Sequence, residues 1–145
     1  MAWASAVMVQ APSEAAVAQQ ADVRLLYCSV LTAREHTRLL AAKRKFVAER
    51  HITGLLVFDG ERLCEYLEGP AHAMQPMAQR IEADPRHQQV QWLLSGPLQG
   101  PRLFKHWQMG FAEVEHAQPM DDIIHATGEV ALQRFLALSR HIECL

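Results

Sequence analysis

Residues 52–70 read ITGLLVFDGERLCEYLEGP, two apolar runs separated by Asp59 and Gly60. An Asp-Gly pair between two apolar runs is typical of a β-hairpin, in which both turn residues take positive φ. Gly69 and Pro70 end the second run, since neither residue favours the continuation of a strand. The stretch therefore predicts two antiparallel strands joined by a tight turn.

A strand and a helix are expected before this hairpin. Residues 23–31 form a short apolar run that is typical of a buried strand, and a helical pattern follows it up to about Arg50. We expect the inward face of this helix to hold Leu39, Ala42, Phe46 and Val47. Its basic residues are expected on a solvated face, and a phosphate-binding patch is the alternative. They are Arg38, Lys43, Arg44, Lys45 and Arg50.

The chain after the hairpin continues the alternation. Residues 71–84 predict a second helix that Pro76 kinks or shortens. Further strands are expected at residues 90–96 and 107–115, separated by a segment too rich in Gly and Pro to be regular. One or two helices follow Pro119.

This order predicts an α+β domain with a ferredoxin-like βαββαββ antiparallel sheet, two helices on one face and additional C-terminal helices. We expect a loosely ordered N-terminal arm at residues 1–21, the domain at 22–116 and a helical extension at 117–145. An apolar stripe in the extension can cover the free face of the sheet, dock on a second copy or bind another protein. Of these, we expect a homo-oligomer. The stripe comprises Val130, Leu132, Phe135, Leu136, Leu138 and Ile142.

Composition excludes several classes of function. The chain has 145 residues and a net charge of −2, so no overall positive field attracts nucleic acid or an anionic membrane. No apolar run approaches the roughly 20 residues that span a bilayer. The absence of HExxH, CxxC, Walker and GxSxG motifs argues against a zinc site, a phosphate cradle and an activated nucleophile. We therefore expect neither a metal site nor an enzyme.

The cysteines are odd in number and widely spaced, at Cys28, Cys64 and Cys144. They fit neither a disulfide framework nor paired metal ligands. Cys28 and Cys64 lie in apolar runs, where a free cysteine behaves as a small hydrophobic residue. This pattern favours a reducing cytoplasm.

Alternation along the strands brings polar side chains onto one face of the sheet. Glu65 lies between Leu63 and Leu67 on the same face, where a carboxylate needs a donor or becomes neutral if it is buried. Tyr27 is a possible donor, and Trp107 and Met109 share a face of the last strand. The pattern allows these side chains to converge, but alternation alone favours a Glu65 that reaches solvent.

The hairpin stretch, together with ADPRH at 83–87 and WQMGF at 107–111, resembles the BLUF family of blue-light sensors. The resemblance covers residues 22–114. It implies an FAD whose isoalloxazine ring lies between the two helices, with Tyr27 as the light-driven electron donor. It also implies that Trp107 and Met109 carry the signal to the sheet. Arg86 and His87 match family residues near the flavin.

Two positions depart from the family. Glu65 stands where the family has its switching glutamine, and Val47 where an asparagine bonds the flavin. An ionised carboxylate only accepts hydrogen bonds, whereas an amide also donates. The loss of these contacts is expected to weaken flavin affinity about ten- to a thousandfold.

Two functional hypotheses follow. The first is an FAD-binding photoreceptor with an altered photocycle that signals through protein contacts. The second is a flavin-free, light-insensitive interaction module on the same fold. An enzyme on a ferredoxin-like sheet is a weaker third, since fold alone does not fix function.

Overall fold

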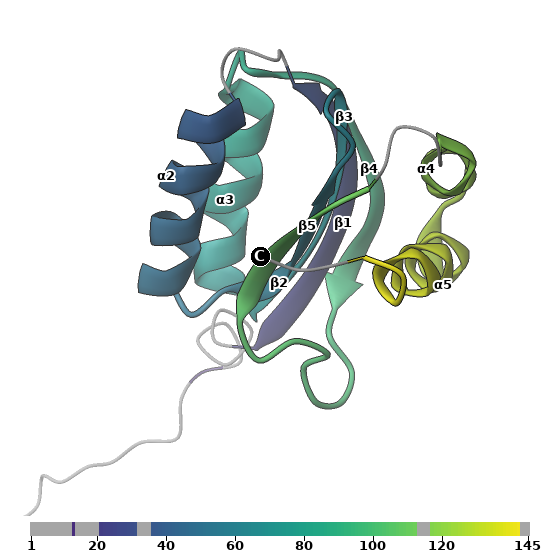
Figure 1. The fold of residues 1–145 in the computed structure, drawn as a ribbon. Helices are drawn as coiled ribbons and strands as arrows, with labels where there is room; N and C mark the ends of the chain where they lie inside the picture. The colour runs from purple at the N-terminus through teal and green to yellow at the C-terminus, as the bar shows by residue number, and fades with distance from the viewer. Residues whose placement is uncertain (1–12, 14–20, 32–35, 113–116, 143–145) are drawn as a thin grey trace, which may run out of the picture.

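The computed structural model describes residues 13, 21–31, 36–112 and 117–142. In this part of the chain, one five-stranded sheet lies between two layers of helices (Figure 1). Helices α2 and α3 cover one face, and α4 and α5 lie against the other. Nearly all of the expected N-terminal arm lies outside the described residues. The elements are β1 (Asp22–Leu31), α2 (His36–Glu49), β2 (Thr53–Phe58), β3 (Arg62–Pro70), α3 (Ala71–Ala83), β4 (His87–Pro97), β5 (Trp107–Phe111), α4 (Ala117–Ile124) and α5 (Gly128–Ser139).

The strand order is β4-β1-β3-β2-β5, which confirms the ferredoxin-like α+β fold. One pairing differs from the expected antiparallel sheet, because β5 runs parallel to β2. The reason is topological. β4 is antiparallel to β1, and β1 and β2 both flank β3 in antiparallel fashion. A strand that reverses direction after β4 and joins the β2 edge must therefore run with β2.

The hairpin of β2 and β3 forms as predicted, with Phe58 paired to Leu63. Its turn differs in detail, since Gly60 has a φ of 98° whereas Asp59 does not take a positive φ. The Asp59 carboxylate instead accepts hydrogen bonds from the backbone N–H groups of Glu61 and Arg62 at 3.0 and 2.6 Å. Aspartate suits this turn because its side chain can bond its own backbone two residues on.

Helix α3 runs from Ala71 to Ala83 and continues through Pro76. The prediction that Pro76 could shorten this helix is therefore wrong. Pro76 lies in the second turn, where its missing N–H removes one hydrogen bond from the helix. Four apolar side chains on the inward face of α3 stabilise it against the sheet. They are Ala73, Met74, Met77 and Ile81.

The Gly- and Pro-rich segment between β4 and β5 is irregular, as expected, and hydrogen bonds of Glu68 and Arg102 help to hold it. Glu68, fully buried, accepts from the backbone N–H groups of Leu103 at 2.8 Å and Phe104 at 3.0 Å. Arg102 donates to the two carboxylate oxygens of Asp22 at 2.8 and 3.1 Å. These contacts fix the point at which β5 begins.

Each face of the sheet has its own apolar core. Along β3, Leu63 and Leu67 join the core under α2 and α3, while Cys64 and Tyr66 join the core under α4 and α5. The alternation predicted for this strand is therefore confirmed.

The C-terminal stripe covers the far face of its own sheet. Leu132, Phe135 and Leu138 are buried there, and Val130 is the exposed member. Ion pairs of Arg24 with Glu129 and of Arg62 with Asp121 join the two C-terminal helices to the strands. Most of the stripe is thus used within the chain, and the homo-oligomer stays a prediction.

Candidate functional site

A fully buried carboxylate, that of Glu65, lies at the centre of the face covered by α2 and α3. Its Oε1 atom accepts from the Tyr27 hydroxyl and from Lys43 Nζ, both at 2.6 Å. Its Oε2 atom accepts from Trp107 Nε1 at 2.8 Å. Lys43 Nζ also lies 3.1 Å from the Tyr27 hydroxyl. Four elements thus contribute to one hydrogen-bonded charge network.

Strand register explains why these side chains meet. Tyr27 of β1 is directly opposite Glu65 of β3, so the two side chains leave the sheet on the same face. Trp107 is paired with Gly54 in β2, and its indole reaches back toward β3. A Cβ at Gly54 would lie 1.9 Å from the carbonyl oxygen of Tyr66, so only glycine allows the strands to approach this closely.

The positive charge of Lys43 balances the negative charge of Glu65 in this network. Burial, followed by the negative charge of Glu65, raises the pKa of Tyr27 well above its ordinary value, so the phenol remains a neutral donor. Lys43 supplies the compensating positive charge from α2, and its side chain is 4% exposed. A buried ion pair is tolerated only where geometry and additional hydrogen bonds offset desolvation. Tyr27 and Trp107 supply those bonds.

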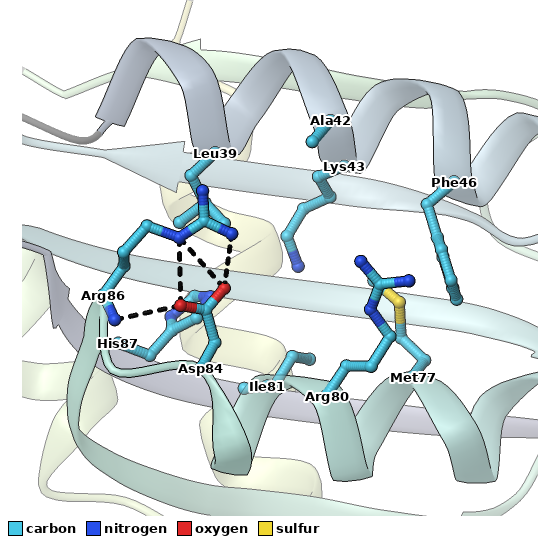
Figure 2. A pocket seen from close by; sticks show the side chains of 10 residues that line it. All are labelled: Leu39, Ala42, Lys43, Phe46, Met77, Arg80, Ile81, Asp84, Arg86 and His87. Atoms are coloured by element: carbon cyan, nitrogen blue, oxygen red, sulfur yellow. Dashed lines mark hydrogen bonds and ion pairs between the residues drawn. The ribbon is translucent and has the colours of Figure 1, made fainter.

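A small hollow lies above this network, between α2 and α3 (Figure 2). Its volume is about 40 Å³. Lys43 points into it from α2, whereas Arg86 folds onto Asp84 at its end, with a closest ion-pair distance of 2.7 Å. The Arg80 guanidinium lies 4.3 Å from the centre of the Phe46 ring. The lining residues are Leu39, Ala42, Lys43, Phe46, Met77, Arg80, Ile81, Asp84, Arg86 and His87.

His87 lies on the floor of the hollow and is buried. Its Nδ1 atom is 2.8 Å from Ser29 Oγ, and its ring centre is 6.0 Å from that of Tyr27. Burial, together with the charge of Lys43, lowers the pKa of His87 to about 4. The imidazole is therefore neutral at physiological pH.

The structure brings together most of the residues singled out in the sequence. Tyr27 and Trp107 each donate a hydrogen bond to Glu65, and Met109 packs against the same core. Arg86 and His87 line the hollow. The expectation that Glu65 reaches solvent is wrong, because Tyr27, Lys43 and Trp107 satisfy it within the protein. Val47 is fully buried in the core and is not among the lining residues.

Sequence reasoning missed Lys43. The solvated face predicted for the basic residues of α2 is correct for Arg38, Arg44 and Lys45 but wrong for Lys43. Leu39, Phe46 and Val47 are buried as expected, and Ala42 is the exception, since it is exposed and Lys43 is buried instead. A signal was present, since Lys43 lies four residues from both Leu39 and Val47, the spacing of one helix face.

Comparison with known proteins identifies the family. A family model described as sensors of blue light using FAD, BLUF, matches residues 23–110, more than half of the chain. The chain therefore belongs to the BLUF family. A comparison with curated proteins finds no match. No helix of the described residues is long and apolar enough to cross a membrane.

Solved structures share the fold at low identity. BlrB, a BLUF protein in its dark state, is 23% identical with a TM-score of 0.66, over 81% of this chain and 93% of that one. Photo-activated BlsA is 18% identical with a TM-score of 0.64, over 78% and 91%. BlrP1 of Klebsiella pneumoniae, as a manganese and cyclic diGMP complex, is 22% identical with a TM-score of 0.58, over 82% and 32%.

The hollow, as its side chains are arranged, does not fit a flavin ring. An apolar cavity of about 150 Å³ holds one benzene ring, whereas this hollow measures about 40 Å³ and isoalloxazine has three fused rings. Both oxygens of Glu65 already accept from protein donors. Among the described residues, the buried side-chain N or O atom without a partner is Arg24 Nε, in a side chain that pairs with α5. Within the described ranges, no buried side-chain nitrogen or oxygen that lines the hollow therefore lacks a partner.

Proposed function

We propose that this chain is a BLUF-type signalling module that acts through protein contacts, and that its own Lys43–Glu65 ion pair takes the place of flavin. The main support for this proposal is the position of Lys43 Nζ, which lies 2.6 Å from Glu65 Oε1 on an almost completely buried side chain. The proposal thus favours the flavin-free hypothesis. Free thiols at Cys28 and Cys64 support a reducing, cytoplasmic setting.

Energetics support an ion pair that competes with flavin. A ring that enters the hollow must displace Lys43, because that side chain occupies the space between the helices. Displacement leaves Glu65 as a buried carboxylate without its cation, at a cost of about 3–5 kcal/mol. That cost corresponds to a flavin affinity weaker by about 10²- to 10⁴-fold.

A second candidate is an FAD-binding photoreceptor with an altered photocycle. It is favoured by the family match and by the 2.6 Å contact of Tyr27 with Glu65, at the position where the resemblance implies the switching glutamine. In that case FAD supplies the absorption of blue light, and Lys43 has moved away from Glu65. A light-induced spectral change would then differ from that of a Glu65→Gln variant.

Flavin content separates the two candidates. We would purify the protein without added cofactor, then titrate it with FAD while recording absorption and flavin fluorescence. The native chain should be colourless, and the Lys43→Ala, Glu65→Gln double variant should bind FAD more tightly. Lys45→Ala, which removes an exposed lysine from the same helix, is the matched control and should behave like the native chain. Native protein that carries stoichiometric flavin would refute the first candidate and establish the second.

A further inference from the structure

Two cysteines that are far apart in the sequence face each other beneath the C-terminal helices. Cys28 of β1 and Cys64 of β3 are directly opposite in the antiparallel pair, and both are buried. Their Sγ atoms are 2.8 Å apart. The pair lies in the second core, on the face opposite to the charge network.

The register of β1 with β3 gives these residues a Cα separation that a disulfide can span. Directly opposite residues of an antiparallel pair have Cα atoms about 4.5–5.5 Å apart. Disulfides span Cα separations of about 4.4–6.8 Å. The pairing of Cys28 with Cys64 therefore meets the Cα requirement of a disulfide, and the 2.8 Å between the two Sγ atoms shows that the side chains point toward each other.

We propose that Cys28 and Cys64 form a reversible cross-strand disulfide, a redox site of this chain, with a small-molecule disulfide such as oxidised glutathione as the oxidant. One protein thiolate attacks a sulfur of the oxidant and forms a mixed disulfide, which releases the first oxidant thiol. The second protein thiolate then displaces the second oxidant thiol. Two protein thiols lose two electrons and two protons, and the oxidant disulfide is reduced to two thiols.

The C-terminal helices control the rate of this reaction. The apolar side chains of Leu132 and Phe135 belong to the same buried core as both sulfurs, so an oxidant reaches them only when α4 and α5 separate from the sheet. The hydrogen bond with Cys28 and burial raise the pKa of Cys64, which keeps its reactive thiolate form scarce in the closed state. The rate of oxidation therefore measures how often this helical layer opens. Once the disulfide has formed, it links β1 covalently to β3.

The test begins with a Cys144→Ser chain, because Cys144 is a third thiol that lies outside the described residues. This chain is incubated with oxidised glutathione, and its intact mass and its peptides under non-reducing conditions are measured. We expect the loss of two hydrogen atoms and a peptide pair joined through Cys28 and Cys64, reversed by a dithiol reductant. Cys28→Ala and Cys64→Ala variants should form only a glutathione adduct.

Two further measurements test the mechanism. Glu129→Gln with Asp121→Asn removes the ion pairs that join the C-terminal helices to the strands, and should speed oxidation about two- to thirtyfold. The oxidised chain should melt roughly 10 °C higher than the reduced one. Thiols that stay free, or glutathione adducts alone, even in the loosened variant would overturn the proposal. A lower melting temperature on oxidation, or a loosened variant that reacts no faster, would equally overturn it.

Discussion

Lys43 Nζ and Glu65 Oε1 lie 2.6 Å apart in the interior, one on helix α2 and the other on the central strand β3. The pair joins the helical layer to the sheet by charge rather than by apolar contact alone. The two side chains depend on each other, because either one left alone is a buried charge with no counter-ion.

The two members of the pair should show strong energetic coupling. Lys43→Met or Glu65→Gln alone is expected to lower the free energy of unfolding by about 3–5 kcal/mol, because the remaining charge stays buried. The double variant should lose less than either single variant, since no unpaired charge remains and the amide can still bond Tyr27 and Trp107. Urea unfolding of all four chains gives the coupling energy. Losses that simply add would contradict the role of the ion pair.

His87 should make stability depend on pH in the acidic range. Its folded-state pKa of about 4 is lower than the ordinary value near 6.5, so between these values the unfolded chain binds the proton and the folded chain does not. Its contribution to stability is thus constant above about pH 6.5 and falls as the pH drops toward 4, by up to about 3 kcal/mol. Thermal melts of the native chain and of His87→Gln between pH 4 and 7 would reveal the difference. If the melting temperatures of the two proteins changed with pH in the same way, His87 would not be the cause of the pH dependence.

Gly54 should not tolerate a methyl group. An added Cβ would meet the Tyr66 carbonyl oxygen at 1.9 Å, and the φ of 154° is one that other residues rarely adopt. Gly54→Ala is expected to destabilise the protein by more than about 3 kcal/mol, since β2 and β3 would have to separate. Gly96→Ala is the control, because a Cβ there has open space. Equal melting temperatures for both variants would show that β2 and β3 can separate enough to accommodate the methyl group without a loss of stability.

Val47→Asn tests whether this position faces a ligand site. Because Val47 is fully buried among apolar residues, an amide there should cost about 1–3 kcal/mol and should not increase the flavin content. Ala48→Asn, on the exposed side of the same helix, should have little effect. A gain in bound flavin with Val47→Asn would show that Val47 lines the cofactor site, as the resemblance implies.

The C-terminal helices should be required for the fold. Ending the chain at Pro119 removes most of the cover from the second core and exposes fully buried Tyr66. We expect aggregation and loss of a cooperative unfolding transition, monitored by light scattering and calorimetry. Separately, scattering by the intact chain measures its oligomeric state directly. A truncated protein that stays soluble and unfolds cooperatively would mean that this layer is dispensable.

Local patterns predicted the strands, the hairpin and the faces of β3 well, because alternation and turn chemistry depend on neighbouring residues. They could not place Lys43, because a lone lysine is ordinarily solvated and the apolar neighbour Ala42 is the more obvious residue for the inward face. The contact of Cys28 with Cys64 depends on the pairing of β1 with β3, which spacing along the chain does not reveal. The parallel edge strand and the passage of α3 through Pro76 likewise depend on tertiary contacts.

Glu68 gives the central strand a second buried carboxylate, three residues after Glu65 and on the opposite face. A slip of β3 by one residue against its neighbours would turn Glu65 toward the C-terminal helices and Glu68 toward α2. Both would then lose their donors together: Tyr27, Lys43 and Trp107 on one side, and the backbone of Leu103 and Phe104 on the other. Apolar side chains alone tolerate such slips, since one leucine replaces another. Two buried carboxylates that point to opposite faces and have different donors therefore penalise a shifted register of β3 energetically.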